Sequence, residues 1–250
     1  HRDLHSFPTR RSSDLAARSY CYYTQFAPAL VSALEPLRGK CLMPLAALRT
    51  RREKSVQEIH AALTGAGIDV GPDEVEQALE RSLDGVAAGQ ARLRERFREE
   101  MARAAEPAVV LVGRPYTILS PEMNKGFPAI FGSLGIKVFS QDMVSYTREE
   151  VDEIEPLLSA FHWHYAARIL EVALVAAKTP LLYPVFVTSF KCSPDSFAVE
   201  YFKRILDERG KPYLVLQLDD HDSSMGYETR IEAEIGRHTS ELQSRQVISY

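Results

Sequence analysis

One cysteine of this chain stands between a strand pattern and a helix pattern. Cys192 follows the β-forming run 181–189, and an amphipathic helical run follows it. Ser193 is a good N-cap, Pro194 suits the first position of a helix, and Asp195 complements the helix dipole. The positive end of a helix favours the thiolate, which is the form that attacks electrophiles or binds a metal.

Two other interpretations of Cys192 stay open at this point. A buried structural cysteine is a common fate of a free thiol and fits the same placement. A hydrolase that pairs Cys192 with His221, at the tip of the following strand pattern, needs the same two residue types. Placement alone does not decide among a reactive thiol, a metal ligand and a core residue.

Polar side chains follow each of the four strand patterns, where the sheet would end. Ligands of open parallel sheets bind outside the carboxyl ends of the strands. We therefore expect these tips to line one cleft, to which an arginine of the last helix also contributes. The expected cleft residues are Arg114, Tyr116, Asp142, Asp195, His221 and Arg230.

The two remaining cysteines lie in the first fifty residues. Cys21 is flanked by aromatic residues, and Cys41 heads an apolar run that includes Leu42, Met43 and Leu45. Neither has the C-x-x-C spacing of a zinc knuckle or a ferredoxin-type cluster. For Cys41 the apolar neighbours predict a position in the core.

Strand and helix patterns alternate from residue 107 onward. Runs of β-branched and apolar residues at 108–112, 136–140, 181–189 and 211–220 are separated by helical patterns. Such alternation predicts an α/β domain at 107–240 with a doubly wound parallel sheet of the Rossmann or flavodoxin-like type. The patterns lack both G-x-G-x-x-G and G-x-x-x-x-G-K-[ST], which disfavours a dinucleotide dehydrogenase and a P-loop NTPase.

The first part of the chain has a different character. Residues 1–15 match one reading frame of a sequencing adapter, and we interpret them as a disordered translated artefact of a protein whose N-terminal part is missing. Residues 16–106 predict a mostly helical segment, the remainder of an upstream domain, whose first part is broken by Pro28, Pro36 and Pro44. Residues 241–250 form a tail.

Composition limits the classes of partner. The formal net charge is −4 and no basic cluster stands out, so nucleic acid is not expected as a partner. No apolar run reaches the roughly 18 residues of a membrane span, so we expect no membrane association either. Three cysteines do not make a disulfide framework, which favours a reducing cytoplasm.

Four segments, taken in order, resemble the acyl-CoA dehydratase activase-related proteins, a domain of unknown function related to the iron–sulfur subunits of 2-hydroxyacyl-CoA dehydratases. Together they span nearly all of the chain after residue 16. The segments are CYYTQFAPALV, VGRPYTILSPEMNKGFP, LLYPVFVTSFKCSPDSF and KPYLVLQLDDHDSSMGYETRIEA.

The resemblance implies α/β domains around a cysteine-bound iron–sulfur cluster, either 4Fe-4S or a double cubane. Cys192 matches the family's loop cysteine and Cys21 an earlier one, so the resemblance implies that both are metal ligands in an incomplete set. Lys191 and Ser193 stand where the family's loop has glycines, which bears on the type of cluster. The implied partners are an ATP-hydrolysing activase domain, in the same chain or separate, and an acyl-CoA substrate.

The resemblance thus predicts a function in ATP-driven, low-potential electron transfer to an acyl-CoA-like substrate. If the protein is an enzyme, it is a dehydratase of the lyase class or a reductase. Two alternatives stay open: an electron-relay partner without its own substrate, and a non-redox α/β binding module that has lost its cluster. No catalytic residue can be assigned.

Overall fold

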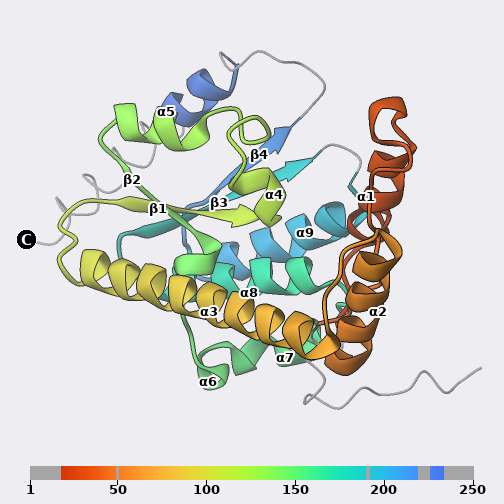
Figure 1. Ribbon diagram of the computed structural model, residues 1–250. Coiled ribbons are helices and arrows are strands. Elements are labelled where there is room, and N and C mark those ends of the chain that lie inside the picture. Colours follow the sequence, from red (N-terminus) through yellow and green to blue (C-terminus); the bar gives the residue numbers. More distant parts are fainter. Residues whose placement is uncertain (1–17, 49–50, 190–191, 219–225, 234–250) are drawn as a thin grey trace, which may run out of the picture. The chain divides into compact units, whose positions relative to one another are not determined.

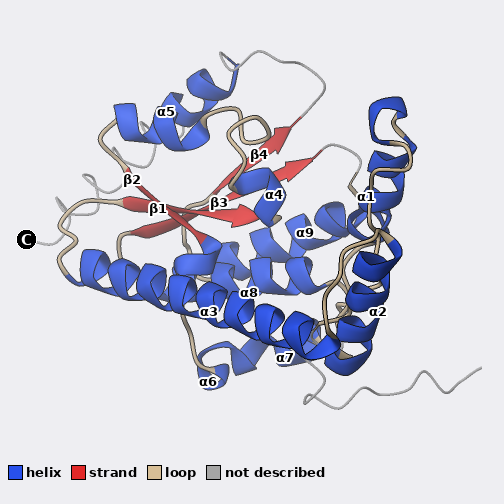
Figure 2. Cartoon of the chain, in the orientation of Figure 1, coloured by secondary structure: helices blue, strands red, loops and turns tan. Residues whose placement is uncertain are grey.

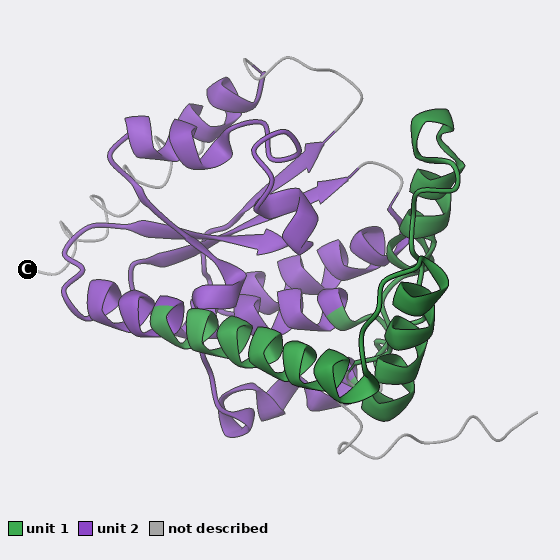
Figure 3. Ribbon diagram, viewed as in Figure 1, with its two compact units in different colours: residues 1–92, 159–164 green, residues 93–158, 165–250 purple. Residues whose placement is uncertain are grey.

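The computed structural model describes residues 18–48, 51–189, 192–218 and 226–233 (Figure 1). Contacts divide the chain into two compact units, which Figure 3 colours separately. Unit 1 comprises residues 1–92 and 159–164, and unit 2 comprises residues 93–158 and 165–250. The predicted artefact 1–15, the tail 241–250, Lys191 and His221 lie outside the described residues.

Helices and strands alternate in unit 2, as Figure 2 shows by colour. The strands are β1 (Ala108–Gly113), β2 (Lys137–Ser140), β3 (Leu182–Ser189) and β4 (Leu214–Leu218). The labelled α-helices in the described residues are α1 (Tyr22–Ala33), α2 (Arg52–Gly65), α3 (Pro72–Ala102), α4 (Pro115–Ile118), α5 (Phe127–Ser133), α6 (Arg148–Val151), α7 (Glu155–Leu158), α8 (His164–Lys178) and α9 (Ser193–Asp207). Short 3₁₀ helices are η2 (Glu35–Leu37), η3 (Gln141–Met143) and η4 (Asp152–Ile154), and residues 226–233 are also helical.

The four described strands form one parallel sheet in the order β2-β1-β3-β4. This order confirms the predicted doubly wound α/β class, because the chain first moves outward from β1 to β2 and then crosses back to β3. The direction of winding reverses between β1 and β3. Ligands of such sheets bind at that switch point, outside the carboxyl ends of the two strands.

Both faces of the sheet are covered, which explains why the strands read as continuous apolar runs. On one face, alternate residues such as Val109 and Leu111 pack with α5 and with the helical residues 226–233. On the other face, Phe186 of β3 meets Phe202 of α9 with ring centroids 5.2 Å apart, edge to face. Figure 1 shows α8 and α9 on the side of the sheet opposite α5.

The end of β1 comes so close to β3 that only glycine fits there. A Cβ atom on Gly113 would lie 2.6 Å from the carbonyl oxygen of Val187 and 2.8 Å from a methyl carbon of Ile118. The amide of Gly113 donates to the Oε1 atom of Gln141, 3.0 Å away, at the end of β2. These contacts hold the tips of three strands together.

Arg168 of α8 holds the segment that follows β2. Arg168 donates to the backbone carbonyls of Gln141 and Val144, at 3.2 and 2.8 Å, and its guanidinium lies 4.5 Å from the ring centroid of Tyr146. The hydroxyl of Tyr146 in turn donates to the buried carboxylate of Glu171. Burial is the main reason why the pKa of Tyr146 is raised.

Unit 1 is held by contacts between distant pieces of chain. Ser19 forms a parallel β-bridge with Trp163, with backbone hydrogen bonds to His162 and His164 of 3.1 and 3.0 Å. Arg52 of α2 pairs with Glu80 of α3 at 2.7 Å. The short segment 159–164 therefore belongs to the first part of the chain although it follows much of unit 2.

Two expectations about the first fifty residues were wrong. Pro28 does not end a segment, because α1 continues from Tyr22 to Ala33 with the proline inside it. Cys41 is only half-buried, and the side chains of Leu42, Met43 and Leu45 are 48, 54 and 71% exposed. An apolar run predicts which side chains tend to be buried, but burial also requires another helix or strand that packs against them.

Candidate functional site

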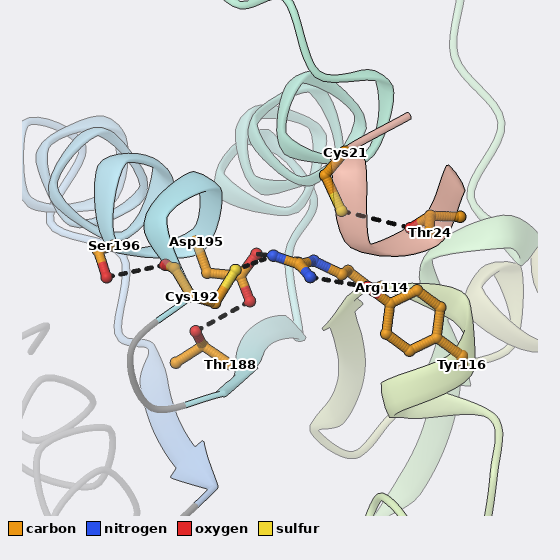
Figure 4. A network of polar contacts seen from close by, with 8 residues as sticks. All are labelled: Cys21, Thr24, Arg114, Tyr116, Thr188, Cys192, Asp195 and Ser196. Carbon is orange, nitrogen blue, oxygen red and sulfur yellow. Dashed lines mark hydrogen bonds and ion pairs between the residues drawn. The ribbon is translucent and has the colours of Figure 1, made fainter. Parts of the chain in front are cut away.

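The guanidinium of Arg114 connects the carboxyl ends of β1 and β3 (Figure 4). The residue follows β1 directly, and its side chain is 8% exposed. Its Nη2 atom contacts the sulfur of Cys192, and its Nε and Nη2 atoms lie 3.2 and 2.9 Å from Oδ1 of Asp195. Its Nη1 atom donates to the hydroxyl of Tyr116 at 2.7 Å.

Asp195 is the buried anion of this group, with a side chain that is 5% exposed. Its second carboxylate oxygen accepts a hydrogen bond of 3.1 Å from the hydroxyl of Thr188, near the end of β3. Burial raises the pKa of Asp195, against the opposing effects of Arg114 and Thr188. The carboxylate thus joins β3, α9 and the residue after β1 in one polar cluster.

Cys192 occupies the N-cap position of α9, one residue earlier than the sequence predicted. Ser193 was expected to cap the helix, but it lies inside the first turn. The carbonyl of Cys192 accepts hydrogen bonds of 2.9 Å from both the amide and the hydroxyl of Ser196, which starts the helix at Cys192. The cysteine side chain makes no capping hydrogen bond, so its sulfur is directed to other partners.

Cys21 has the same local position in unit 1. It is the N-cap residue of α1, is buried, and makes no side-chain capping bond to the helix backbone. Its sulfur lies 3.3 Å from the hydroxyl oxygen of Thr24 (Figure 4). Each cysteine that the sequence singled out as a ligand therefore begins a helix, where the dipole favours an anionic sulfur. Cys41 lies outside any helix or strand.

The other expected cleft residues differ in their settings. Tyr116, the acceptor for Arg114, lies in α4 and is 41% exposed. Asp142 lies in η3 at the end of β2 and is half-buried. Arg230 is exposed on the helical residues 226–233. The structure thus brings Arg114, Tyr116, Asp195 and Cys192 into one cluster.

Two polar residues at the carboxyl ends of the strands were not predicted from the sequence. Thr188 donates a hydrogen bond to Asp195, and the fully buried Gln141 accepts one from the amide of Gly113. The Nε2 atom of Gln141 has no hydrogen-bond partner among the described residues. A polar residue that ends an otherwise apolar strand run was the available signal for Thr188.

An iron–sulfur cluster requires thiolate ligands, and Cys192 and Cys21 each lie at the positive end of a helix. Among the described residues there is no group of three or more His, Cys, Asp or Glu side chains that could hold a metal ion. The two cysteines therefore fit as individual ligands, but the described part of each unit does not supply a full set.

No helix in the described part of the chain is long and apolar enough to cross a membrane. No match was found among curated proteins or among solved structures.

One family model matches the chain, that of the CoA enzyme activase uncharacterised domain, over residues 4–144. The match includes Cys21, the Gly113–Arg114 step and Asp142, and it ends before β3 and Cys192. It agrees with the resemblance to activase-related proteins that the sequence motifs indicated. Because the match covers more than half of the chain, the chain belongs to the family of the CoA enzyme activase uncharacterised domain.

Proposed function

We propose that this protein takes part in ATP-driven, low-potential electron transfer to an acyl-CoA-like substrate, and that Cys192 and Cys21 each serve as a thiolate ligand in iron–sulfur chemistry. The observation that carries the proposal is the position of Cys192. Its sulfur lies at the N-terminus of α9, beside the point where the winding of the sheet reverses. Membership of a CoA enzyme activase family supplies the chemical context.

The protein's own residues prepare the site in two ways. The start of α9 and the guanidinium of Arg114 both favour a negatively charged sulfur at Cys192. Burial of the Arg114–Asp195 pair at the strand ends keeps the surroundings of that sulfur fixed. When bound, an iron–sulfur cluster supplies one-electron chemistry at low potential, which these thiolates would tune.

The proposed partners follow from the same context. An ATP-hydrolysing activase domain, in the same chain or separate, would provide the electrons, and an acyl-CoA-like compound would receive them. The cytoplasm is the proposed compartment, because free thiols persist there.

A second candidate is a non-redox α/β module that keeps the fold without a cluster. Two observations favour it: the guanidinium of Arg114 already contacts the sulfur of Cys192, and the described residues hold no group of three metal-ligating side chains. In this case Cys192 would act only as a partner for Arg114.

Anaerobic reconstitution with iron and sulfide separates the two candidates. We expect the parent protein to acquire iron with thiolate-to-iron absorption and to lose it quickly to a chelator, because its ligand set is incomplete. Cys192→Ser and Cys21→Ser should each reduce the iron bound at first sampling. Cys41→Ser is the matched control and should behave like the parent. Equal iron binding by all four proteins, or no thiolate absorption in the parent, would refute the cluster.

A further inference from the structure

We propose that Arg114 is the positioning residue of Cys192, and that Asp195 acts only through it. This inference rests on the proposed function for its purpose, since a ligand thiolate needs a fixed direction. The evidence is the group of polar side chains around Arg114, whose guanidinium contacts both the sulfur of Cys192 and the carboxylate of Asp195. None of these side chains was assigned a role by the family match.

All three nitrogen atoms of the Arg114 guanidinium are engaged. Nε and Nη2 face Asp195, Nη2 also contacts Cys192, and Nη1 donates to Tyr116. A planar fork with this many donors holds its partners in fixed directions. A lysine ammonium carries a charge but cannot reach three partners on three sides with the same geometry. The arrangement therefore depends on arginine and not on positive charge alone.

If stability were its only role, the buried Arg114–Asp195 ion pair would be an unfavourable way to join β1 to α9. Taking two charges out of water is unfavourable, and apolar side chains of similar volume often stabilise a fold as well or better. Elsewhere between β3 and α9 the contact is made by apolar side chains such as Phe186 and Phe202. A buried ion pair beside Cys192 is therefore better explained by the sulfur that it contacts.

These polar side chains also lie where the fold favours ligand binding. Arg114 directly follows β1, and Thr188 and Cys192 lie at and after the end of β3, so the three residues span the switch point of the sheet. Thr188 fixes the free oxygen of Asp195 at 3.1 Å, which leaves the other oxygen to hold Arg114. The chain of contacts thus runs from β3 through Asp195 and Arg114 to the sulfur.

The first test uses the protein without iron. Selective ¹³Cβ labelling of cysteine gives three resonances, one for each cysteine, which single Cys→Ser variants assign. We expect Arg114→Gln and Asp195→Asn to move the Cys192 resonance and to leave that of Cys41 unchanged. Tyr116→Phe removes one hydroxyl from an exposed side chain and should cause a smaller shift in a fully folded protein. Arg209→Gln, which removes an Arg–Glu pair elsewhere in unit 2, is the matched control and should shift nothing.

Arg114→Lys decides between position and charge. We expect this variant to shift the Cys192 resonance as Arg114→Gln does, because lysine lacks the fork. If Arg114→Lys matches the parent, or if Arg114→Gln and Tyr116→Phe both leave the Cys192 resonance in place, the positioning role is overturned.

The second test uses reconstituted protein and its rate of iron loss to a chelator. Residues that orient a metal ligand typically change metal affinity about 10–100-fold when mutated, so we expect loss to be about 10-fold faster in Arg114→Gln. Iron loss at the parent rate despite a moved Cys192 resonance would overturn the role in ligation. If the parent itself acquires no iron, the proposed function fails, while the shift of the resonance still decides whether Arg114 positions Cys192.

Discussion

Arg114 and Cys192 are in direct contact although 78 positions separate them in the chain. The contact arises because β1 and β3 are neighbours in the sheet, with Gly113 in register with Val187. Residues that follow two adjacent parallel strands emerge at the same edge. One of them carries a cation and the other a sulfur that the start of α9 favours as an anion.

Asp195→Asn should destabilise unit 2 strongly. The substitution keeps the shape of the side chain but leaves the Arg114 cation buried without its counter-charge. Breaking a buried ion pair in this way costs about 3–5 kcal/mol. Urea unfolding followed by circular dichroism measures the change, and a loss below about 1 kcal/mol would contradict a buried pair.

Arg114→Met should be less harmful, and its effect should depend on pH. Burial already raises the pKa of Asp195 above 3.8, and loss of the cation raises it further. A carboxyl whose pKa is raised in the folded state contributes its full stability below the unfolded pKa and loses it as pH rises through the folded pKa. The difference in melting temperature between parent and variant should therefore shrink as pH falls from about 7 to about 4.5. A difference that stays constant or grows on acidification would exclude this explanation.

Gly113→Ala should destabilise the sheet edge. The added methyl group would lie 2.6 Å from the carbonyl oxygen of Val187, which is backbone and cannot move aside cheaply. Overpacking of this kind typically costs about 1–3 kcal/mol. Gly132→Ala in α5 is the matched control, because nothing lies within 4 Å of its added Cβ, and it should stabilise by about 0.4–1 kcal/mol. Chemical denaturation of both variants provides the comparison, and equal effects would argue against the close approach.

Lys211 should titrate well below the usual range for lysine. Desolvation lowers its pKa to about 8, and its ammonium donates to the carbonyl of Thr179 at 2.7 Å. Between this value and 10.5, the unfolded chain binds more protons than the folded protein, so this residue's contribution to stability should increase as pH rises through that window. NMR titration of ¹³C-methylated lysines measures the pKa directly, and Lys211→Arg identifies the resonance. A midpoint for that resonance at 10 or above would contradict the prediction.

Thr147→Ala should weaken the start of α6. Thr147 and Glu150 form a capping box, in which the carboxylate of Glu150 accepts the amide of Thr147 at 2.6 Å. Loss of such a cap costs about 0.5–2 kcal/mol, whereas Thr147→Ser keeps the hydroxyl and should cost less. Thermal melts of the two variants rank them, and the reverse order would show that the hydroxyl is not what stabilises the turn.

The parallel sheet could be predicted because its strands are buried on both faces. Runs such as 108–112 are apolar without alternation, which is typical of a central parallel strand, and the helical patterns between them leave few other topologies. The same reasoning placed Arg114 and Cys192 at one edge of the sheet. The local sequence pattern was sufficient to predict these strands, because each strand can be recognised from its own residues.

The pairing of Arg114 with Asp195 could not be predicted in the same way. Asp195 was expected to complement the dipole of α9, and its role as the counter-ion of Arg114 depends on the register between β1 and β3. For Cys41 the sequence was misleading, since its apolar neighbours suggested a core that the described residues do not build around it. Both cases concern contacts with residues that are distant in sequence, about which local composition carries no information.

The bridge between Ser19 and Trp163 determines how this protein can be divided for expression. Because residues 159–164 belong to unit 1, a truncation after residue 92 would remove the backbone partners of Ser19. A clone of unit 2 would need the chain between Leu158 and Tyr165 replaced by a short linker. A break after residue 92 would also fall inside α3, so gene fragments that follow the linear order of the sequence would divide this helix as well as the bridge.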